Sequence, residues 1–182
     1  PFRYNCFSEI EALVRDHKIG AIKMEVSRNE GPKDHFLQKV REIATQNNIV
    51  LIFDECTSGF RETFGGLHKK YGVEPDIAVF GKALGNGYPI TAVIGRDEVM
   101  EVAQDTFISS TFWTERIGNV AGLKTLEIME KERSWESITR VGSTINQRWE
   151  KLANKFNLPL EISGLPALTS FNIPSPNWQI YK

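Results

Sequence analysis

The sequence has 182 residues, of which 41% are hydrophobic and 25% charged, and its formal net charge is -1. This length suits one domain, or slightly more than one, with a real hydrophobic core. The balanced charge argues against nucleic acid as a partner, and no apolar run approaches the roughly 20 residues of a membrane helix. Because Cys6 and Cys56 make no disulfide framework and no secretory signal is visible, we expect a cytoplasmic protein.

The first half of the chain shows helical and strand-like patterns in alternation. Ser8, followed by Glu11 three residues later, is typical of a helix N-cap, and Pro32 is well placed at a helix start. The apolar run 49–53 is continuous, which favours a strand covered on both faces, as in a parallel sheet. The predicted elements are helices from residue 8 to about 20 and at 32–47, a helical turn at 67–71, and strands at 21–26, 49–53, 77–80 and 89–95.

The second half of the chain is predicted to be mainly helical. The predicted elements are helices at 97–103, 115–131 and 135–156, an apolar, hydroxyl-rich loop or strand at 107–113, and short strands at 158–162 and 167–173. A shift in composition near residues 132–134 predicts two domains, 1–133 and 134–182. The fold class is therefore α/β, mainly a parallel sheet flanked by helices, followed by the start of a small α+β domain. Since the chain starts without Met and ends just after a strand-like run, we expect a fragment of a longer protein.

Two opposite charges follow two of the predicted strands. Asp54 ends one apolar run, and Lys82, 28 residues later, follows the next in a glycine-rich turn. Ligands of open α/β sheets bind outside the carboxyl ends of the strands, where both residues should lie. A structural salt bridge between them and a functional site are about equally compatible with the spacing alone.

The surroundings of Lys82 favour a functional site. Gly81, Gly85 and Gly87 allow close approach, and apolar neighbours would lower the pKa of the amine and make it nucleophilic. The turn does not match a nucleotide-binding loop, because Asp76 and Ala83 stand where that motif needs Gly and Ser or Thr. A lysine opposite an aspartate suits pyridoxal 5'-phosphate (PLP): the amine holds the cofactor as a Schiff base, and the carboxylate keeps the pyridine nitrogen protonated.

The strings FDECTSGFR, GVEPD and FGKALGNGYPITAVIG, in this order, resemble the class III, fold-type-I PLP-dependent aminotransferases, in particular the branch of glutamate-1-semialdehyde 2,1-aminomutase. The resemblance covers the chain from about residue 4 to at least residue 129. It implies that the chain is part of the PLP-binding large domain, followed by the start of the small domain. It also implies that the phosphate-binding loop and the aromatic residue that stacks on the ring precede Pro1.

The resemblance also assigns roles to individual residues. Lys82 would be the catalytic lysine, bonded to the cofactor and moving a proton between the substrate Cα and the cofactor C4′. Asp54 would pair with the pyridinium nitrogen, Cys56 would pack against the ring as a small hydrophobe, and Thr111 would donate to the phosphate of the neighbouring subunit. A reactive thiol at Cys56 is the less favoured interpretation, since apolar burial raises a thiol pKa.

Other positions match the family without a definite role or depart from its pattern. Glu25 and Arg61 match positions near the site, but ordinary charges at a strand end or in a loop explain them as well. Val26, and the stretch 114–119, stand where the family commonly has Pro and Asn-Pro, which affects the substrate pocket. The three histidines are far apart in the sequence, so no metal site is expected.

These observations predict a PLP-dependent aminotransferase or intramolecular aminomutase. Its partners would be a small amino donor and a carbonyl acceptor, and it would work as a homodimer with active sites at the subunit interface. The alternatives are a PLP-dependent decarboxylase or racemase on the same scaffold, and a catalytically silent homologue that serves as an interaction domain.

Overall fold

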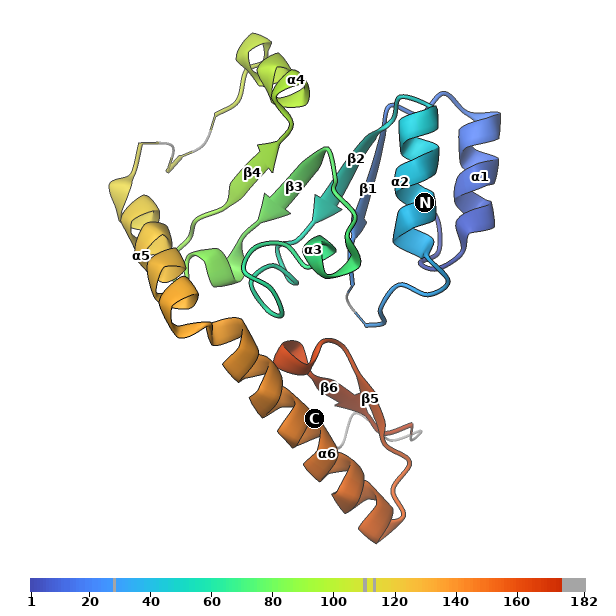
Figure 1. The fold of residues 1–182 in the computed structure, drawn as a ribbon, viewed down its shortest axis with the longest axis vertical. Coiled ribbons are helices and arrows are strands. Elements are labelled where there is room, and N and C mark those ends of the chain that lie inside the picture. Colours follow the sequence, from blue (N-terminus) through green and yellow to red (C-terminus); the bar gives the residue numbers. More distant parts are fainter. Residues whose placement is uncertain (28, 110, 113, 175–182) are drawn as a thin grey trace.

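The computed structural model describes residues 1–27, 29–109, 111–112 and 114–174. Its centre is a four-stranded sheet in the order β1-β2-β3-β4, in which the first three strands are parallel and the fourth is antiparallel (Figure 1). The strands are β1 (Ala21–Glu25), β2 (Val50–Asp54), β3 (Ile77–Phe80) and β4 (Ala92–Gly95). The predicted α/β class with a mainly parallel sheet is confirmed.

One face of this sheet carries most of the core. Helices α1 (Phe7–Asp16) and α2 (Phe36–Gln46) contribute Ile10, Leu37 and Val40 to the cluster that contains Leu51 and Phe53 of β2. Burial alternates along β2, because its other residues are only partly buried. The second face of this strand is only partly covered by the described residues, and coverage of both faces stays a prediction. We call this less buried face the open face, and it matters because Asp54 belongs to it.

The remaining elements follow the predicted order closely. Figure 1 shows α5 leading into the longer α6, which extends away from the sheet with the β5–β6 hairpin beside it. A close contact between α6 and the hairpin explains Gly142, where a Cβ would lie 1.8 Å from the carbonyl oxygen of Pro166. The elements are α3 (His68–Tyr71), η1 (Lys82–Leu84), α4 (Asp97–Met100), η2 (Glu101–Asp105), α5 (Arg116–Glu132), α6 (Ser134–Phe156), β5 (Glu161–Ser163), η3 (Pro166–Leu168) and β6 (Ser170–Asn172).

Two predicted helix starts are wrong. Helix α1 begins at Phe7 with Cys6 at the N-cap, and the acid that reaches back is Glu9, which accepts from the Arg3 backbone N–H at 2.7 Å. Helix α2 begins at Phe36, four residues after the proline, because His35 has a left-handed backbone with φ of 58°. Both helices exist as predicted, but longer-range contacts and backbone conformation decide where they begin.

The segment 107–113 was expected to be a loop or a strand. Its described residues form no strand, while Ser110 and Trp113 lie outside the described part. Between α5 and α6 only Arg133 is non-helical, with φ of 48°. The domain boundary expected there stays a prediction. Within the described ranges, no helix has the length and apolar character needed to cross a membrane.

Candidate active site

The carboxyl ends of the three parallel strands form the edge on which the predicted site residues gather. Asp54 is the last residue of β2 and lies in register with Glu25, the last residue of β1. Lys82 comes two residues after β3 and opens the 3-10 turn η1, with φ of 44°. The parallel pairing of β2 with β3 therefore places the acid and the amine at the same edge of the sheet.

Asp54 is a partly exposed carboxylate with two partners. Its Oδ2 lies 3.0 Å from the ammonium of Lys23, and its Oδ1 accepts from the Cys56 backbone N–H at 3.2 Å. Burial alone would raise the pKa of Asp54, but the Lys23 and Cys56 hydrogen bonds outweigh it and hold that pKa below its ordinary value. The carboxylate is therefore ionised at neutral pH.

Lys82 does not form the salt bridge with Asp54 that the spacing allowed. Its Nζ donates to Thr57 Oγ1 at 2.6 Å, and within the described ranges no carboxylate pairs with it. The sequence predicted a desolvated amine, whereas Lys82 is exposed, although Ala83 and Leu84 beside it are buried. The acid and the amine thus share one edge without neutralising each other.

Cys56 links the ends of the two central strands. A Cβ on Gly81 would lie 3.3 Å from the Cys56 Sγ, so the thiol packs against the backbone just before Lys82. Burial, followed by the nearby Asp54 carboxylate, raises the pKa of the Cys56 thiol. The expected direction of this pKa shift is confirmed, and it supports a packing role rather than a nucleophilic one.

The other candidate residues are less closely connected to this edge. Thr111 is exposed, and no contact in the described part of the chain joins it to Asp54, Cys56 or Lys82. Arg61 is partly buried, and its Nε donates to the Thr57 carbonyl oxygen at 3.4 Å. Thr57, which the sequence did not single out, is therefore the common neighbour of Arg61 and Lys82.

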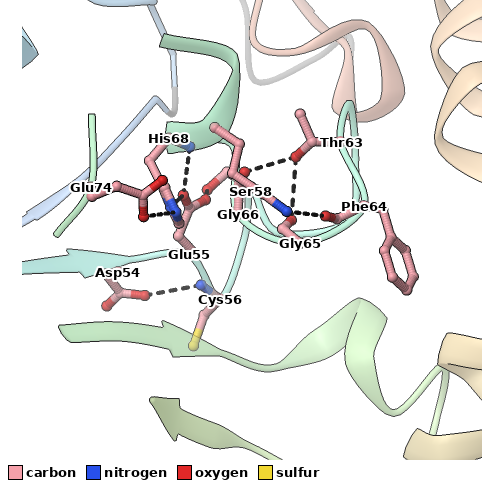
Figure 2. A network of polar contacts seen from close by, with 11 residues as sticks. Asp54, Glu55, Cys56, Ser58, Thr63, Phe64, Gly65, Gly66, His68 and Glu74 are labelled. Atoms are coloured by element: carbon pink, nitrogen blue, oxygen red, sulfur yellow. Dashed lines mark hydrogen bonds and ion pairs between the residues drawn. The ribbon is translucent and has the colours of Figure 1, made fainter. Parts of the chain in front are cut away.

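The sequence also gave no indication of a buried polar group behind this edge. Glu55 follows Asp54 but is completely buried, and Figure 2 shows its side chain among Ser58 and His68 while Asp54 lies apart from them. Glu55 Oε1 accepts from the His68 backbone N–H at 2.9 Å and lies 2.9 Å from the ring Nδ1, and Oε2 accepts from Ser58 Oγ. We call Glu55, Ser58 and His68 the Glu55 cluster.

Hydrogen bonds decide the ionisation of Glu55. Burial by itself would raise the pKa of this carboxyl, but donors from His68, Ser58 and the local backbone outweigh burial and hold the pKa below its ordinary value. The carboxylate thus ties the turn after β2 to the start of α3, 13 residues further along. The Glu55 carboxylate thereby fixes the loop that carries Thr57 and Arg61.

A family model described as aminotransferase class-III matches residues 3–180. The chain belongs to the class-III aminotransferase family. The family inferred from the three sequence motifs is thereby confirmed, and so is its cofactor, since class-III aminotransferases are PLP-dependent.

Individual relatives support this membership. The chain is 36% identical over 190 residues to a 3-aminobutyryl-CoA aminotransferase of Cloacimonas acidaminovorans, covering 100% of the chain and 46% of the relative. It is 34% identical to a glutamate-1-semialdehyde 2,1-aminomutase of Ruminiclostridium cellulolyticum, covering 91% and 40%. The chain thus spans less than half the length of these relatives.

A solved structure agrees with the fold. The PLP internal aldimine form of the FumI protein of Sphingopyxis sp. MTA144 superposes with a TM-score of 0.87 at 25% identity, covering 93% of this chain and 43% of that one. The four-stranded sheet and its helices therefore have the arrangement of the PLP-dependent transferase fold.

The residues of this class-III chain fit the cofactor. An ionised Asp54 can hold a proton on a ring nitrogen, and an exposed Lys82 amine at the same edge is free to react with an aldehyde. These two groups do not pair with each other, so the carboxylate can meet a basic nitrogen and the amine an aldehyde.

Proposed function

We propose that the protein to which this chain belongs is a PLP-dependent aminotransferase, which moves an amino group from an amino donor to a keto or aldehyde acceptor. The observation that carries the proposal is the placement of Asp54 and Lys82 at one sheet edge, each partnered by a different residue. The similarity to glutamate-1-semialdehyde 2,1-aminomutases favours, as a second candidate, an intramolecular version in which donor and acceptor are one molecule.

Each residue at the edge has a defined task in this proposal. Bound PLP supplies an electron sink for the carbanion that forms at the substrate Cα. Asp54 keeps the ring nitrogen protonated, because its own pKa is held low by Lys23 and Cys56. Lys82 would hold the cofactor through its amine and would serve as the base and acid that moves a proton at the substrate Cα. Cys56 would contribute a small apolar side chain to the surface that holds the ring.

We extend the proposal to assembly and compartment. A homodimer with active sites at the subunit interface would give the exposed Thr111 a function, as a hydroxyl donor to the phosphate bound in the partner. The absence of a disulfide between Cys6 and Cys56, both free in the structure, supports a reducing compartment such as the cytoplasm.

The test of this proposal is covalent labelling of Lys82. Full-length protein loaded with PLP should show an absorbance band near the edge of the visible range that disappears on borohydride reduction, with the label on the Lys82 peptide. Lys82→Ala should lose the label and transamination, while Lys131→Ala, which removes another exposed lysine, should retain both. A label elsewhere, or full transamination by Lys82→Ala, would contradict the assignment.

A further inference from the structure

Packing does not fix the position of the Lys82 amine. The Lys82 side chain is exposed, and it lines a cavity of about 730 Å³ between its own turn and the helices α5 and α6. Because a lysine stem has several rotatable bonds, an exposed amine can point in many directions. The contact that gives this amine a defined place is its hydrogen bond to Thr57 Oγ1, at 2.6 Å.

The partner of this amine is a neutral group, which matters for its reactivity. A carboxylate partner favours the protonated form of an amine, and that form is not a nucleophile. A hydroxyl accepts a hydrogen bond from an ammonium group and can equally donate one to a neutral amine. Thr57 can therefore hold Lys82 in either protonation state, while the nearby Asp54 carboxylate pairs with Lys23 instead.

Thr57 is itself held in place from two sides. Its carbonyl oxygen accepts from Arg61 Nε at 3.4 Å, and the Arg61 carbonyl oxygen accepts from Thr139 Oγ1 of α6 at 3.2 Å. On the other side, the next residue, Ser58, donates to Glu55 within the Glu55 cluster. The β-branched side chain of Thr57 also has few χ1 rotamers. The hydroxyl thus has a defined position from which it can orient a mobile partner.

We propose that Thr57 is a positioning residue for the reacting lysine, and that its hydroxyl holds the Lys82 amine at the carboxyl edge of the sheet. This inference rests on the proposed function, in which Lys82 is the group that reacts with PLP and moves the proton. Thr57 takes no part in the bonds that form or break, and it acts through Lys82 alone. Because holding a reacting group in place accelerates its reaction, loss of the hydroxyl should lower rates and leave substrate affinity unchanged.

The first experiment follows the loading of cofactor-free, full-length protein with PLP. Thr57→Val removes the hydroxyl from a side chain of similar shape, so the borohydride-sensitive absorbance band should form about 10-fold more slowly than in wild type. Thr57→Ser keeps the hydroxyl and should load within about threefold of the wild-type rate. Thr63→Val is the matched control, because it removes a hydroxyl of the same loop that donates to the backbone carbonyl oxygens of Gly65 and Gly66 (Figure 2). It should load as wild type.

Three results of this experiment would overturn the proposal. Equal loading rates of Thr57→Val and wild type would show that the hydroxyl does not orient the amine. Equal slowing in Thr57→Val and Thr63→Val would assign the effect to the loop as a whole. A Thr57→Ser rate as low as that of Thr57→Val would assign it to the methyl group of the threonine.

The second experiment separates kcat from KM in transamination by the PLP-loaded, full-length enzyme. Thr57→Val should lower kcat about 10-fold and leave KM within about twofold of wild type, and Thr57→Ser should recover most of the loss. A raised KM with unchanged kcat would overturn the proposal, by placing Thr57 on the substrate. The Lys82 label tests the proposed function separately. A wild-type label on Lys82 together with wild-type rates in Thr57→Val would refute the positioning role alone, whereas a wild-type protein without label on Lys82 would refute the proposed function.

Discussion

Asp54 and Glu55 are adjacent in the sequence but belong to two regions that differ in how completely their polar groups are paired. Strand geometry sends consecutive side chains to opposite faces, so Asp54 lies on the open face and Glu55 among the packed groups behind it. The Glu55 cluster is closed, with both carboxylate oxygens bonded. The edge at Lys82 is open, and neither Lys82 nor Arg61 has a carboxylate partner within the described part of the chain.

This difference separates structural from functional polar groups. A buried network in which every polar group has a hydrogen-bond partner fixes one conformation of the chain. This is the behaviour expected of residues that support a functional site. A set of charges that remains unbalanced beside a cavity is more informative, because a ligand can complete it. The Glu55 cluster holds the loop 55–68 in place, and that loop presents Thr57 and Arg61 to the open edge.

The strongest test of the closed region is removal of its central carboxylate. Glu55→Ala leaves the Ser58 hydroxyl and the His68 donors buried without an acceptor, so we expect a loss of about 3–5 kcal/mol in the free energy of unfolding. Urea unfolding of the full-length protein measures it. Glu74→Ala is the matched control, because that carboxylate lies 3.6 Å from the His68 ring but its side chain is 71% exposed. Equal stability of the two variants would show that the cluster does not hold the loop.

A smaller loss of stability is expected when a glycine in each of the two regions is replaced by alanine. Gly66→Ala would place a Cβ 2.3 Å from the His68 ring and 2.8 Å from Glu55 Oε1, so the cluster must shift at a cost of about 1–3 kcal/mol. Gly81→Ala at the open edge meets its nearest atom, Cys56 Sγ, at 3.3 Å, and a slight movement of the thiol relieves this contact. Its expected cost is about 0.5 kcal/mol or less, as for most tolerated substitutions.

Thermal unfolding of the two alanine variants, measured side by side on the full-length protein, tests this ranking. A larger loss for Gly81→Ala than for Gly66→Ala would mean that the open edge is the more tightly packed of the two regions. The cofactor should be left out, because ligand that binds only the folded state raises the apparent stability.

The sequence predicts the open edge better than the closed cluster for a physical reason. Asp54 and Lys82 stand directly after strongly apolar runs, and strands of this kind form where their periodicity places them. Glu55 is bonded to His68, 13 residues away, and nothing local to Glu55 reveals that contact. The same limitation explains the helix starts, where Glu9 bonds to Arg3 outside the helix and His35 adopts a left-handed backbone.

The partner of Asp54 was missed for the same reason. Lys23 lies on the neighbouring strand, two residues before the position in register with Asp54, and only the pairing of β1 with β2 brings the two charges together. The motif resemblance correctly identified the family, but it did not reveal that Thr57 is bonded to both Arg61 and Lys82.

The smallest expected effect concerns pH and separates the two carboxylates. Both have folded-state pKa values below their ordinary values, so each is more protonated in the unfolded chain than in the folded one as the solution is acidified. Their stabilisation is therefore fully present above the unfolded pKa, at about pH 5 and higher, and is lost as the pH falls through the folded pKa. Stability should decrease on acidification in wild type, and this slope should be shallower in Glu55→Gln and in Asp54→Asn.

Salt distinguishes the two contributions. The Lys23 side chain is 62% exposed, so the attraction that lowers the Asp54 pKa is screened as ionic strength rises, whereas Glu55 is completely buried and its hydrogen-bond donors are shielded from the solvent. The test is to measure the free energy of unfolding from about pH 3 to 7 at low and at high salt. The difference in this free energy between Asp54→Asn and wild type should change with salt concentration. The difference between Glu55→Gln and wild type should be the same at both salt concentrations. If salt changed the free-energy differences of Glu55→Gln and Asp54→Asn from wild type equally, solvent would reach the Glu55 cluster. The cluster would then not be a closed region.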